Sequence, residues 1–304
     1  MFKEKDWELE MNIDLHIHTS KSDGILTPKE VIDEAKKNNV NVISICDHDT
    51  IDAYTLDLLE YAKKNNIKLI YGVEISTKYK GYGYHVLGYN IDIFNKDLKE
   101  ELSKIRLARH NYLYEVSKKL NELGYIVNTN ELDKIDSVTK AHIANDIINN
   151  ENNKDLLIKK FNKIPNKGEF IETLLNENCP CYVEKLSITP YVASCMIKKY
   201  GGKVILAHPV AYYYEDKKTI EDITNLLKEM NADGIEGNYI YIDKNNIKHN
   251  DIDIWNNLAN KLNIISTIGS DFHNFDNIHP VIGLINEDIK VDKNDIINKL
   301  LNEK

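Results

Sequence analysis

The sequence predicts an α/β protein whose barrel-like scaffold is interrupted by a helical insertion. Short apolar runs alternate with helical patterns over residues 1–94 and again over residues 191–304, which is typical of a parallel sheet built from βαβ units. Residues 95–190 instead carry helical patterns without a clear strand. We therefore expect one α/β barrel domain made of residues 1–94 and 191–304, and a helical insertion subdomain of residues 95–190.

Strands and helices alternate in the first part of the chain. The segment Thr27-Pro28-Lys29-Glu30 is a capping box with proline at the first helical position, and it predicts a helix that runs to about residue 38. The β-branched residues of 40–46 are typical of a strand that is buried on both faces. In order, we expect strands over 12–16, 40–46, 67–73 and 82–89, and helices over 27–38 and 52–65.

The insertion begins with a long helix. Apolar side chains at spacings of three, four or seven predict one helix over residues 96–124, and shorter helical patterns continue to about residue 178. The alternation then resumes in the last third of the chain. There we expect helices over 190–200, 217–230, 251–262 and 292–301, and strands over 203–207, 234–236 and 264–268.

Composition and charge exclude several classes of protein. Of the 304 residues, 42% are hydrophobic and 29% are charged, as in ordinary soluble globular proteins. The net charge of −9 offers no attraction for duplex nucleic acid. The four cysteines lack the spacing of a zinc knuckle, and we see neither a signal peptide nor an apolar run of about 18 residues. We expect a cytoplasmic protein with no membrane partner, monomeric or weakly oligomeric.

Histidines and carboxylates gather where the predicted strands end. His16 and His18 are two residues apart, so in a strand they point to the same face. The carboxyl ends of barrel strands meet on one face, and imidazole and carboxylate are ligands that suit zinc, manganese and iron. Each motif alone is more often a core histidine or a turn, but together they predict a multi-metal hydrolase. The groups after later strands are His48, Glu74, His208, Asp271 and His273.

The motifs in their order resemble the polymerase and histidinol phosphatase (PHP) family. The resemblance extends over nearly the whole chain, and it is greatest to the stand-alone branch of nucleoside 3′,5′-bisphosphate phosphatases and 5′-to-3′ exoribonucleases. The matching segments are Asp14-Leu15-His16-Ile17-His18-Thr19, Ser22-Asp23-Gly24, Cys46-Asp47-His48-Asp49-Thr50, Gly72-Val73-Glu74-Ile75-Ser76, His85-Val86-Leu87-Gly88, Ala207-His208-Pro209 and Gly269-Ser270-Asp271-Phe272-His273.

This resemblance implies a fold, a ligand set and a cofactor. The fold it implies is a distorted seven-stranded α/β barrel with a helical insertion. The cofactor is two or three divalent ions of manganese, iron or zinc, with Glu74 as a bridging ligand. The implied metal ligands, which would act in catalysis through metal-bound hydroxide, are His16, His18, Asp23, His48, Glu74, His85, His208, Asp271 and His273.

The charge of such a centre suits a phosphate. Asp23, Glu74 and Asp271 contribute three negative charges, and two or three divalent ions contribute four or six positive charges. A protein with negative net charge can therefore hold a phosphate at this site. Metal ions lower the pKa of a bound water from about 15.7 to about 7, which leads us to expect attack of hydroxide on phosphorus. The expected substrates are small phosphomonoesters of the nucleotide type, including nucleoside 3′,5′-bisphosphates or short RNA 5′ ends.

Four further residues are candidate substrate contacts. Arg106 and Arg109 lie on one side of the long predicted helix, where a second phosphate clamp could form. His142 matches a histidine that contacts substrate phosphate in the family. Lys140 stands where the family usually has arginine, and lysine keeps the charge but loses the planar fork of donors.

Three other functions remain open at this point. A dedicated histidinol phosphatase is the rival within the family. An amidohydrolase-type C–N hydrolase also begins with two histidines on a barrel strand, although no lysine follows the Glu74 strand directly to form the carboxylated bridge common in that class. A non-catalytic metal-stabilised module is the third, although this chain carries no polymerase region and its ligand set is complete.

Overall fold

The computed structural model describes residues 12–133, 135, 138–184, 187–243, 245–276 and 279–301. The chain divides into two compact units, which are Met1–Leu102 with Ile188–Lys304, and Ser103–Ser187. We call them the α/β unit and the helical unit. The boundaries expected at residues 95 and 190 stay a prediction. Among the described residues, no helix has the length and apolar character needed to cross a bilayer.

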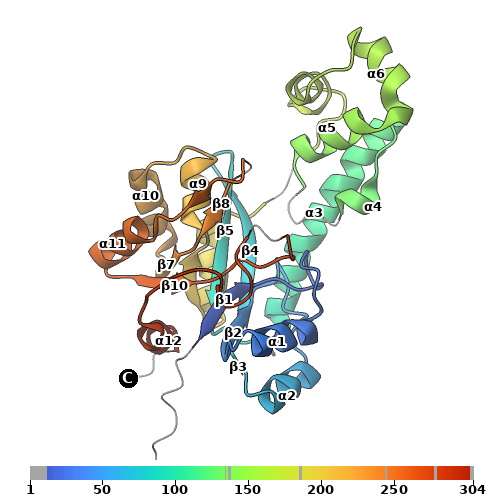
Figure 1. Cartoon of the computed structure of the whole chain (residues 1–304). Coiled ribbons are helices and arrows are strands. Elements are labelled where there is room, and N and C mark those ends of the chain that lie inside the picture. The colour runs from blue at the N-terminus through green and yellow to red at the C-terminus, as the bar shows by residue number, and fades with distance from the viewer. Residues whose placement is uncertain are drawn as a thin grey trace, which may run out of the picture. The chain divides into compact units, whose positions relative to one another are not determined.

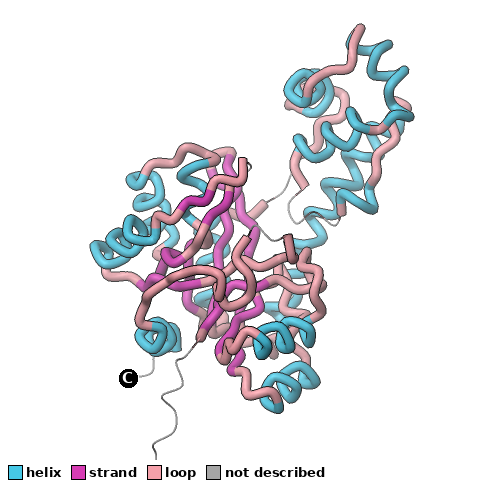
Figure 2. The backbone as a smooth tube through the Cα atoms, viewed as in Figure 1, coloured by secondary structure: helices cyan, strands magenta, loops and turns pink. Residues whose placement is uncertain are grey.

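The α/β unit contains two larger sheets and a small hairpin (Figures 1 and 2). The three-stranded sheet has the order β1-β2-β3 and the five-stranded sheet the order β10-β7-β6-β5-β4. Two isolated bridges, Ile17 with Phe272 and His48 with Glu74, lie between these sheets. The strands are β1 (Ile13–Ile17), β2 (Val42–Ile45), β3 (Lys68–Leu69), β4 (Gly72–Tyr79), β5 (Tyr82–Tyr89), β6 (Lys203–Leu206), β7 (Gly234–Asn238), β8 (Tyr241–Ile242), β9 (Lys248–His249) and β10 (Ile265–Ile268).

The mixed α/β fold agrees with the sequence, but the expectation of a parallel sheet is wrong for β5. Strand β5 runs antiparallel to both of its neighbours, β4 and β6. The reason is the tight turn between β4 and β5, where Lys80 and Gly81 have φ angles of 49° and 87°. Two consecutive residues with positive φ are typical of hairpin turns that match the twist of antiparallel strands. The chain therefore turns back on itself without a crossover helix.

The single strand expected over residues 67–73 is also wrong. It is replaced by β3, which pairs with β2, and by β4, which pairs with β5. The chain changes sheet between them, and a Cβ on Gly72 would stand 2.2 Å from Ser44 Oγ. That contact shows how closely the crossing chain approaches β2. As a result Glu74 lies inside β4 and does not follow a strand.

Helices cover the outside of the sheets (Figure 1). Helix α8 packs on β4, β5 and β6, and α11 packs on β7 and β10. The capping box predicted for the first helix is present, because Thr27 and Glu30 exchange side-chain-to-backbone hydrogen bonds at its start. The helices are α1 (Pro28–Lys37), α2 (Leu56–Lys64), α8 (Pro190–Lys199), α9 (Pro209–Tyr214), α10 (Ile220–Met230), α11 (Ile252–Leu262) and α12 (Lys293–Leu301).

Two helix boundaries and two elements differ from the prediction. Helix α2 begins at Leu56 and not at residue 52, because the Thr55 side chain accepts a hydrogen bond from Leu58 N and caps the helix there. Helix α10 begins three residues later than expected for the same reason, with Thr219 as its N-cap. The short helix α9 and the β8–β9 hairpin were not expected. Both are too short to produce a periodic pattern.

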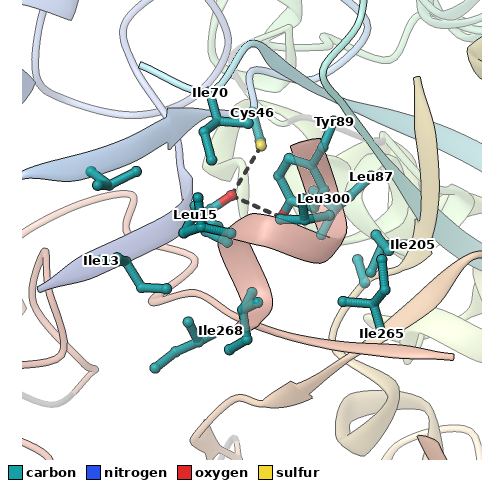
Figure 3. Packing of buried hydrophobic residues seen from close by; sticks show 14 of the residues in the cluster. Ile13, Leu15, Cys46, Ile70, Leu87, Tyr89, Ile205, Ile265, Ile268 and Leu300 are labelled. Atoms are coloured by element: carbon teal, nitrogen blue, oxygen red, sulfur yellow. Dashed lines mark hydrogen bonds between the residues drawn. The ribbon is translucent and has the colours of Figure 1, made fainter. Parts of the chain in front are cut away.

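A buried apolar cluster supports the strand that carries the first motif (Figure 3). Side chains of β1, β6 and β10 contribute Ile13, Ile205 and Ile265, and helix α12 contributes Leu300. The carbonyl oxygen of Leu15 accepts hydrogen bonds from Tyr89 Oη at 2.8 Å and from Cys46 Sγ at 3.3 Å. Since Leu15 directly precedes His16, these contacts fix the end of β1 from which the first imidazole projects.

The helical unit has its own core. The long helix expected over 96–124 is present as α3, which begins in the α/β unit and continues into the helical unit. Buried residues of α3, α5 and α7 pack together there, including Val116, Ile143 and Phe170. The elements are α3 (Lys96–Glu122), α4 (Thr129–Leu132), α5 (Lys140–Asn149), a 3₁₀ turn (Glu151–Asn153), α6 (Lys154–Phe161), α7 (Lys167–Phe170) and a π turn (Ile171–Leu175).

Candidate metal centre

Strand β1 contributes the first two imidazoles. His16 lies in β1 and His18 follows its last residue, so their side chains project from the same face. Both residues are fully buried, and their Nε2 atoms lie 3.1 Å apart. The loop that follows returns so closely that a Cβ on Gly24 would stand 2.5 Å from the backbone of His18. Only glycine fits at that position.

Glu74 lies at the centre of the cluster. Its Oε2 is 3.1 Å from Nε2 of His16 and 3.1 Å from Nε2 of His18. His48 Nε2 is 3.3 Å from the same oxygen. The other carboxylate oxygen, Oε1, lies 3.2 Å from a ring nitrogen of each of two further histidines, His85 and His208. One carboxylate therefore faces imidazoles from β1, β5 and the segments after β2 and β6.

Asp271 joins this group from the segment after β10. Its Oδ1 lies 3.3 Å from His16 Nε2 and 3.2 Å from His18 Nε2. Its Oδ2 accepts a hydrogen bond from the Tyr239 hydroxyl at 3.2 Å. The backbone of Asp271 has a φ of 53°, in a left-handed region that aspartate adopts more readily than most residues. One oxygen is thus held by tyrosine while the other faces the imidazoles.

Asp23 gathers a second set of imidazoles. Its Oδ1 lies 3.4 Å from His18 Nδ1, and its Oδ2 lies 3.4 Å from His273 Nε2. His48 Nε2 is 4.0 Å from that second oxygen. The rings of His18 and His273 stack with their centroids 4.0 Å apart. His18 therefore belongs to both sets.

The structure brings all nine sequence-predicted ligands together. Eight of them form three overlapping groups, and within each group the possible ligand atoms lie within 4.8 Å of one another. The ninth, His208, is joined to them through Glu74 and through His85, whose Nδ1 lies 3.2 Å from His208 Nε2. The groups are His18, Asp23, His48 and His273; His16, His18, Glu74 and Asp271; and His48, Glu74 and His85.

Some ligands of the cluster are fully buried and others are partly exposed to solvent. The side chains of His16 and His18 have no solvent exposure. The side chains of His85 and His273 are 24% and 29% exposed, and that of Asp271 is 18% exposed. A small molecule can therefore reach the cluster where these side chains are exposed to solvent.

The charges of the cluster shift its imidazoles toward the protonated form. Burial alone would lower the pKa of His16, but the carboxylates of Glu236 and Glu74 outweigh burial and raise it well above the ordinary value. The pKa of His18 is likewise raised against the effect of burial, chiefly by the neighbouring carboxylate of Asp23. In the absence of a metal, protons on these rings balance the buried carboxylates.

The carboxylates shift in the opposite direction. Burial would raise the pKa of Glu74, but the imidazoles of His16 and His48 lower it well below the ordinary value. The pKa values of Asp23 and Asp271 are lowered in the same way, against burial, by the surrounding histidines. The acidic ligands are therefore ionised at neutral pH, as metal binding requires.

The donor set fits divalent metal ions. Glu74 Oε2, Asp23 Oδ1 and Asp271 Oδ1 are buried and make no hydrogen bond, although imidazole nitrogens stand between 3.1 and 3.4 Å away. Buried carboxylate oxygens are normally hydrogen-bonded, and the exceptions need an explanation such as an ion. Imidazole nitrogen and carboxylate oxygen around a shared point provide that explanation for zinc, manganese or iron.

Sequence reasoning assigned no supporting role to three carboxylates that contact the cluster or its loops. Glu236 Oε1 lies 2.9 Å from His16 Nδ1. Asp47 accepts three hydrogen bonds from Thr19 and Ser22, in the loop that carries Asp23. Asp14 accepts hydrogen bonds from Ser270 N at 2.9 Å and Gly283 N at 2.8 Å. A signal was available for Glu236, because an acidic residue within a strand that is buried on both faces is seldom found without a partner.

The four candidate substrate contacts all lie in the helical unit. Lys140 donates a hydrogen bond to Asn176 Oδ1 at 3.0 Å, and His142 Nδ1 accepts one from Thr139 N in the cap of α5. Arg106 lies in α3 and is half-buried. The backbone of Arg109 also lies in α3, but its side chain is outside the described part of the chain. Their role in binding substrate stays a prediction.

Comparison with known proteins gives consistent matches. A family model described as the PHP domain matches residues 14–188. A 5′-3′ exoribonuclease from Haemophilus influenzae is 31% identical over 264 residues, which cover 86% of this chain and 89% of that protein. A 3′,5′-nucleoside bisphosphate phosphatase from Chromobacterium violaceum is 26% identical over 266 residues, which cover 86% of this chain and 87% of that protein.

A solved structure shows the same fold. It is that of a candidate metal-dependent phosphoesterase from Bifidobacterium adolescentis, and it aligns with a TM-score of 0.65 at 18% identity. The alignment covers 96% of this chain and 96% of that chain. The chain is therefore similar in fold over almost its full length.

Proposed function

The chain belongs to the PHP family, and on that premise we propose that it is a metal-dependent phosphoesterase that hydrolyses small phosphomonoesters of the nucleotide type. The observation that carries the proposal is the meeting of nine imidazole and carboxylate side chains from distant parts of the chain around Glu74. The relatives named above support phosphoester chemistry, because one is an exoribonuclease and another is a nucleoside bisphosphate phosphatase.

We propose that the cluster holds two or three divalent ions of manganese, iron or zinc. Glu74 is the bridging ligand in this proposal, because its two oxygens face different sets of imidazoles. When bound, such ions supply Lewis acidity, which lowers the pKa of a water molecule and neutralises charge on phosphoryl oxygens. The ligands in the proposal are the nine predicted from the sequence, His16, His18, Asp23, His48, Glu74, His85, His208, Asp271 and His273.

The protein itself orients the substrate and excludes water from the buried part of the cluster. His16, His18 and Glu74 are fully buried, so the phosphoryl group of a substrate would meet the cluster at its exposed side chains. The three acidic ligands supply less negative charge than two divalent ions supply positive charge. The centre therefore attracts a phosphate although the chain carries a net charge of −9.

We further propose that the strands form the distorted seven-stranded barrel expected from the sequence. Two bridges support this. Ile17 pairs with Phe272, which joins the end of β1 to the segment after β10, and His48 pairs with Glu74, which joins the segment after β2 to β4. Both bridges lie at the cluster, so closure of the barrel and assembly of the site would depend on the same residues.

The proposed substrates are nucleoside 3′,5′-bisphosphates or the 5′ ends of short RNA. In this proposal Lys140, His142, Arg106 and Arg109 of the helical unit bind substrate phosphate. Lysine at position 140 supplies charge without the bidentate geometry of arginine. We therefore expect it to bind the substrate phosphate with less geometric selectivity than arginine would.

A substrate panel with elemental analysis tests the function. The purified protein should contain manganese, iron or zinc and should release phosphate from adenosine 3′,5′-bisphosphate or degrade a 5′-phosphorylated RNA. Chelation should abolish turnover and metal should restore it. Faster release of phosphate from histidinol phosphate would favour the histidinol phosphatase. Hydrolysis of amides or lactones without phosphatase activity would favour a C–N hydrolase, and metal-loaded protein inert on every substrate would indicate a non-catalytic module.

A further inference from the structure

Glu236 joins two of the proposed ligands that come from different strands. It lies in β7 and is fully buried. Its Oε1 lies 2.9 Å from Nδ1 of His16, in β1, and its Oε2 accepts a hydrogen bond from the backbone N of His208 at 2.8 Å. Each oxygen of one carboxylate therefore has its own partner. Neither partner is a metal-facing atom.

The contact with His16 selects one form of its ring. Nε2 of His16 faces Glu74 and Asp271, so this nitrogen must carry a lone pair to bind a metal. A neutral imidazole has one protonated nitrogen, which must then be Nδ1. Glu236 Oε1 is placed to accept that proton in a hydrogen bond, and a carboxylate behind a metal-binding histidine commonly fixes both the tautomer and the ring orientation.

The contact with His208 holds an unusual backbone. His208 has a φ of 24° and a ψ of 60°, outside the regions that L-residues normally adopt. Such conformations persist only where surrounding contacts hold them. The hydrogen bond from His208 N to Glu236 is one such contact. It sets the direction in which the His208 side chain leaves the end of β6.

Space for this arrangement is provided by Gly269. A Cβ at that position would stand 2.4 Å from the Cβ of His16 and 2.6 Å from Glu236 Oε1. Any other residue would push apart the two groups that must touch. The absence of a side chain at 269 is thus an independent sign that the contact between His16 and Glu236 is part of the site.

We propose that Glu236 is a positioning residue that fixes the metal-binding tautomer of His16 and the strained backbone of His208 at the same time. This inference rests on the proposed metal site. Loss of the carboxylate should misdirect two ligands through a single change, while Glu236 itself touches neither metal nor substrate.

Replacement of Glu236 by glutamine provides the test, because an amide has one acceptor where the carboxylate has two. If the amide oxygen accepts from His208 N, the amide NH₂ faces His16 Nδ1 and favours the ring form with a proton on Nε2, toward the metal. If the oxygen faces His16 Nδ1, the NH₂ opposes the His208 N–H in a buried place. Either orientation should weaken zinc binding by about 10- to 100-fold.

The matched control is Asp233→Asn. Asp233 Oδ2 accepts a hydrogen bond from Val204 N at 2.9 Å, so it also links β7 to β6, but it lies at the other end of these strands. Zinc affinity of this variant should stay within about twofold of the wild type, since a second-sphere effect requires contact with a ligand. The comparison separates the effect of losing any carboxylate that links β6 and β7 from the effect of losing Glu236.

Two measurements read the outcome without relying on turnover. Zinc alone is titrated by competition with a chromophoric chelator, and ¹⁵N-histidine NMR of the zinc-loaded protein should show a protected Nδ1–H of His16 that Glu236→Gln lacks. Zinc affinity equal to that of Asp233→Asn, together with a retained Nδ1–H signal, would overturn the inference. If Glu236→Gln shows no cooperative melting, Glu236→Asp takes its place, with zinc binding expected to weaken and unchanged binding counting against the inference. A wild-type protein that binds no zinc, manganese or iron would instead overturn the proposed function.

Discussion

Replacing Asp47 by alanine should destabilise the α/β unit and release the loop that carries Asp23. Asp47 is buried, and its carboxylate accepts hydrogen bonds from Thr19 N, Thr19 Oγ1 and Ser22 Oγ, each at 2.7 Å. Since Thr19 is fully buried, its backbone N–H would lose its partner in a place that water does not reach. We expect these bonds to be lost together.

The size of the effect follows from the burial of each donor. An unsatisfied buried donor costs about 1 to 3 kcal/mol, and a lost hydrogen bond of the Thr19 hydroxyl about 1 kcal/mol. Ser22 is only partly buried, so water can replace its bond. We therefore expect the free energy of unfolding of the metal-free protein to fall by about 2 to 4 kcal/mol. Because Asp23 lies in the same loop, we also expect weaker metal binding by the group formed with His18.

Urea unfolding provides the assay. Trp255 is buried in the α/β unit, and a Trp7→Phe background makes its fluorescence the sole tryptophan signal. The matched control is Asp222→Ala, because Asp222 also accepts from the backbone N and the Oγ1 of one threonine, Thr219, but on the exposed surface. Water can satisfy those donors, so the control should lose much less stability. Equal losses in the two variants, with unchanged metal content, would refute the reasoning.

The remaining predictions concern turnover, substrate binding and pH. Asp271→Asn should abolish phosphoester hydrolysis and lower the bound metal measured by elemental analysis; full metal content with full turnover would remove Asp271 from the site. His142→Ala should chiefly raise KM, and a KM equal to that of the wild type would exclude His142 from the substrate site. The raised pKa values of His16, His18 and His273 stabilise the metal-free protein below pH about 6.5, and this stability is lost as pH rises through the higher folded-state values. Urea unfolding at pH 6 and 8 should show this loss of stability. Calorimetry in buffers of different ionisation enthalpy should show that metal binding releases protons. Equal stability at both pH values and no proton release would contradict the proposed protonation of these histidines.

The sequence by itself determined the ligand set and most of the elements. His16 and His18 lie two residues apart in a recognisable strand, and the acidic and imidazole groups that follow stand in short motifs whose residue types already specify metal chemistry. Local signals were sufficient for the helix that begins with the Thr27 capping box, whereas the starts of α2 and α10 were misplaced although Thr55 and Thr219 cap them. Such information is local, so it can be read from neighbouring residues.

Only the tertiary structure decided how these groups meet. The reversal of β5 depends on the Lys80–Gly81 turn, and the place of Glu74 inside β4 depends on where the chain changes sheet. Glu236 becomes part of the site only because β7 lies beside β6 and opposite His16, 220 positions away in sequence. Its role depends on the pairing of β7 with β6 and on the absence of a side chain at Gly269. The contacts of Glu236 with His16 and His208 are properties of packing between strands that are distant in sequence.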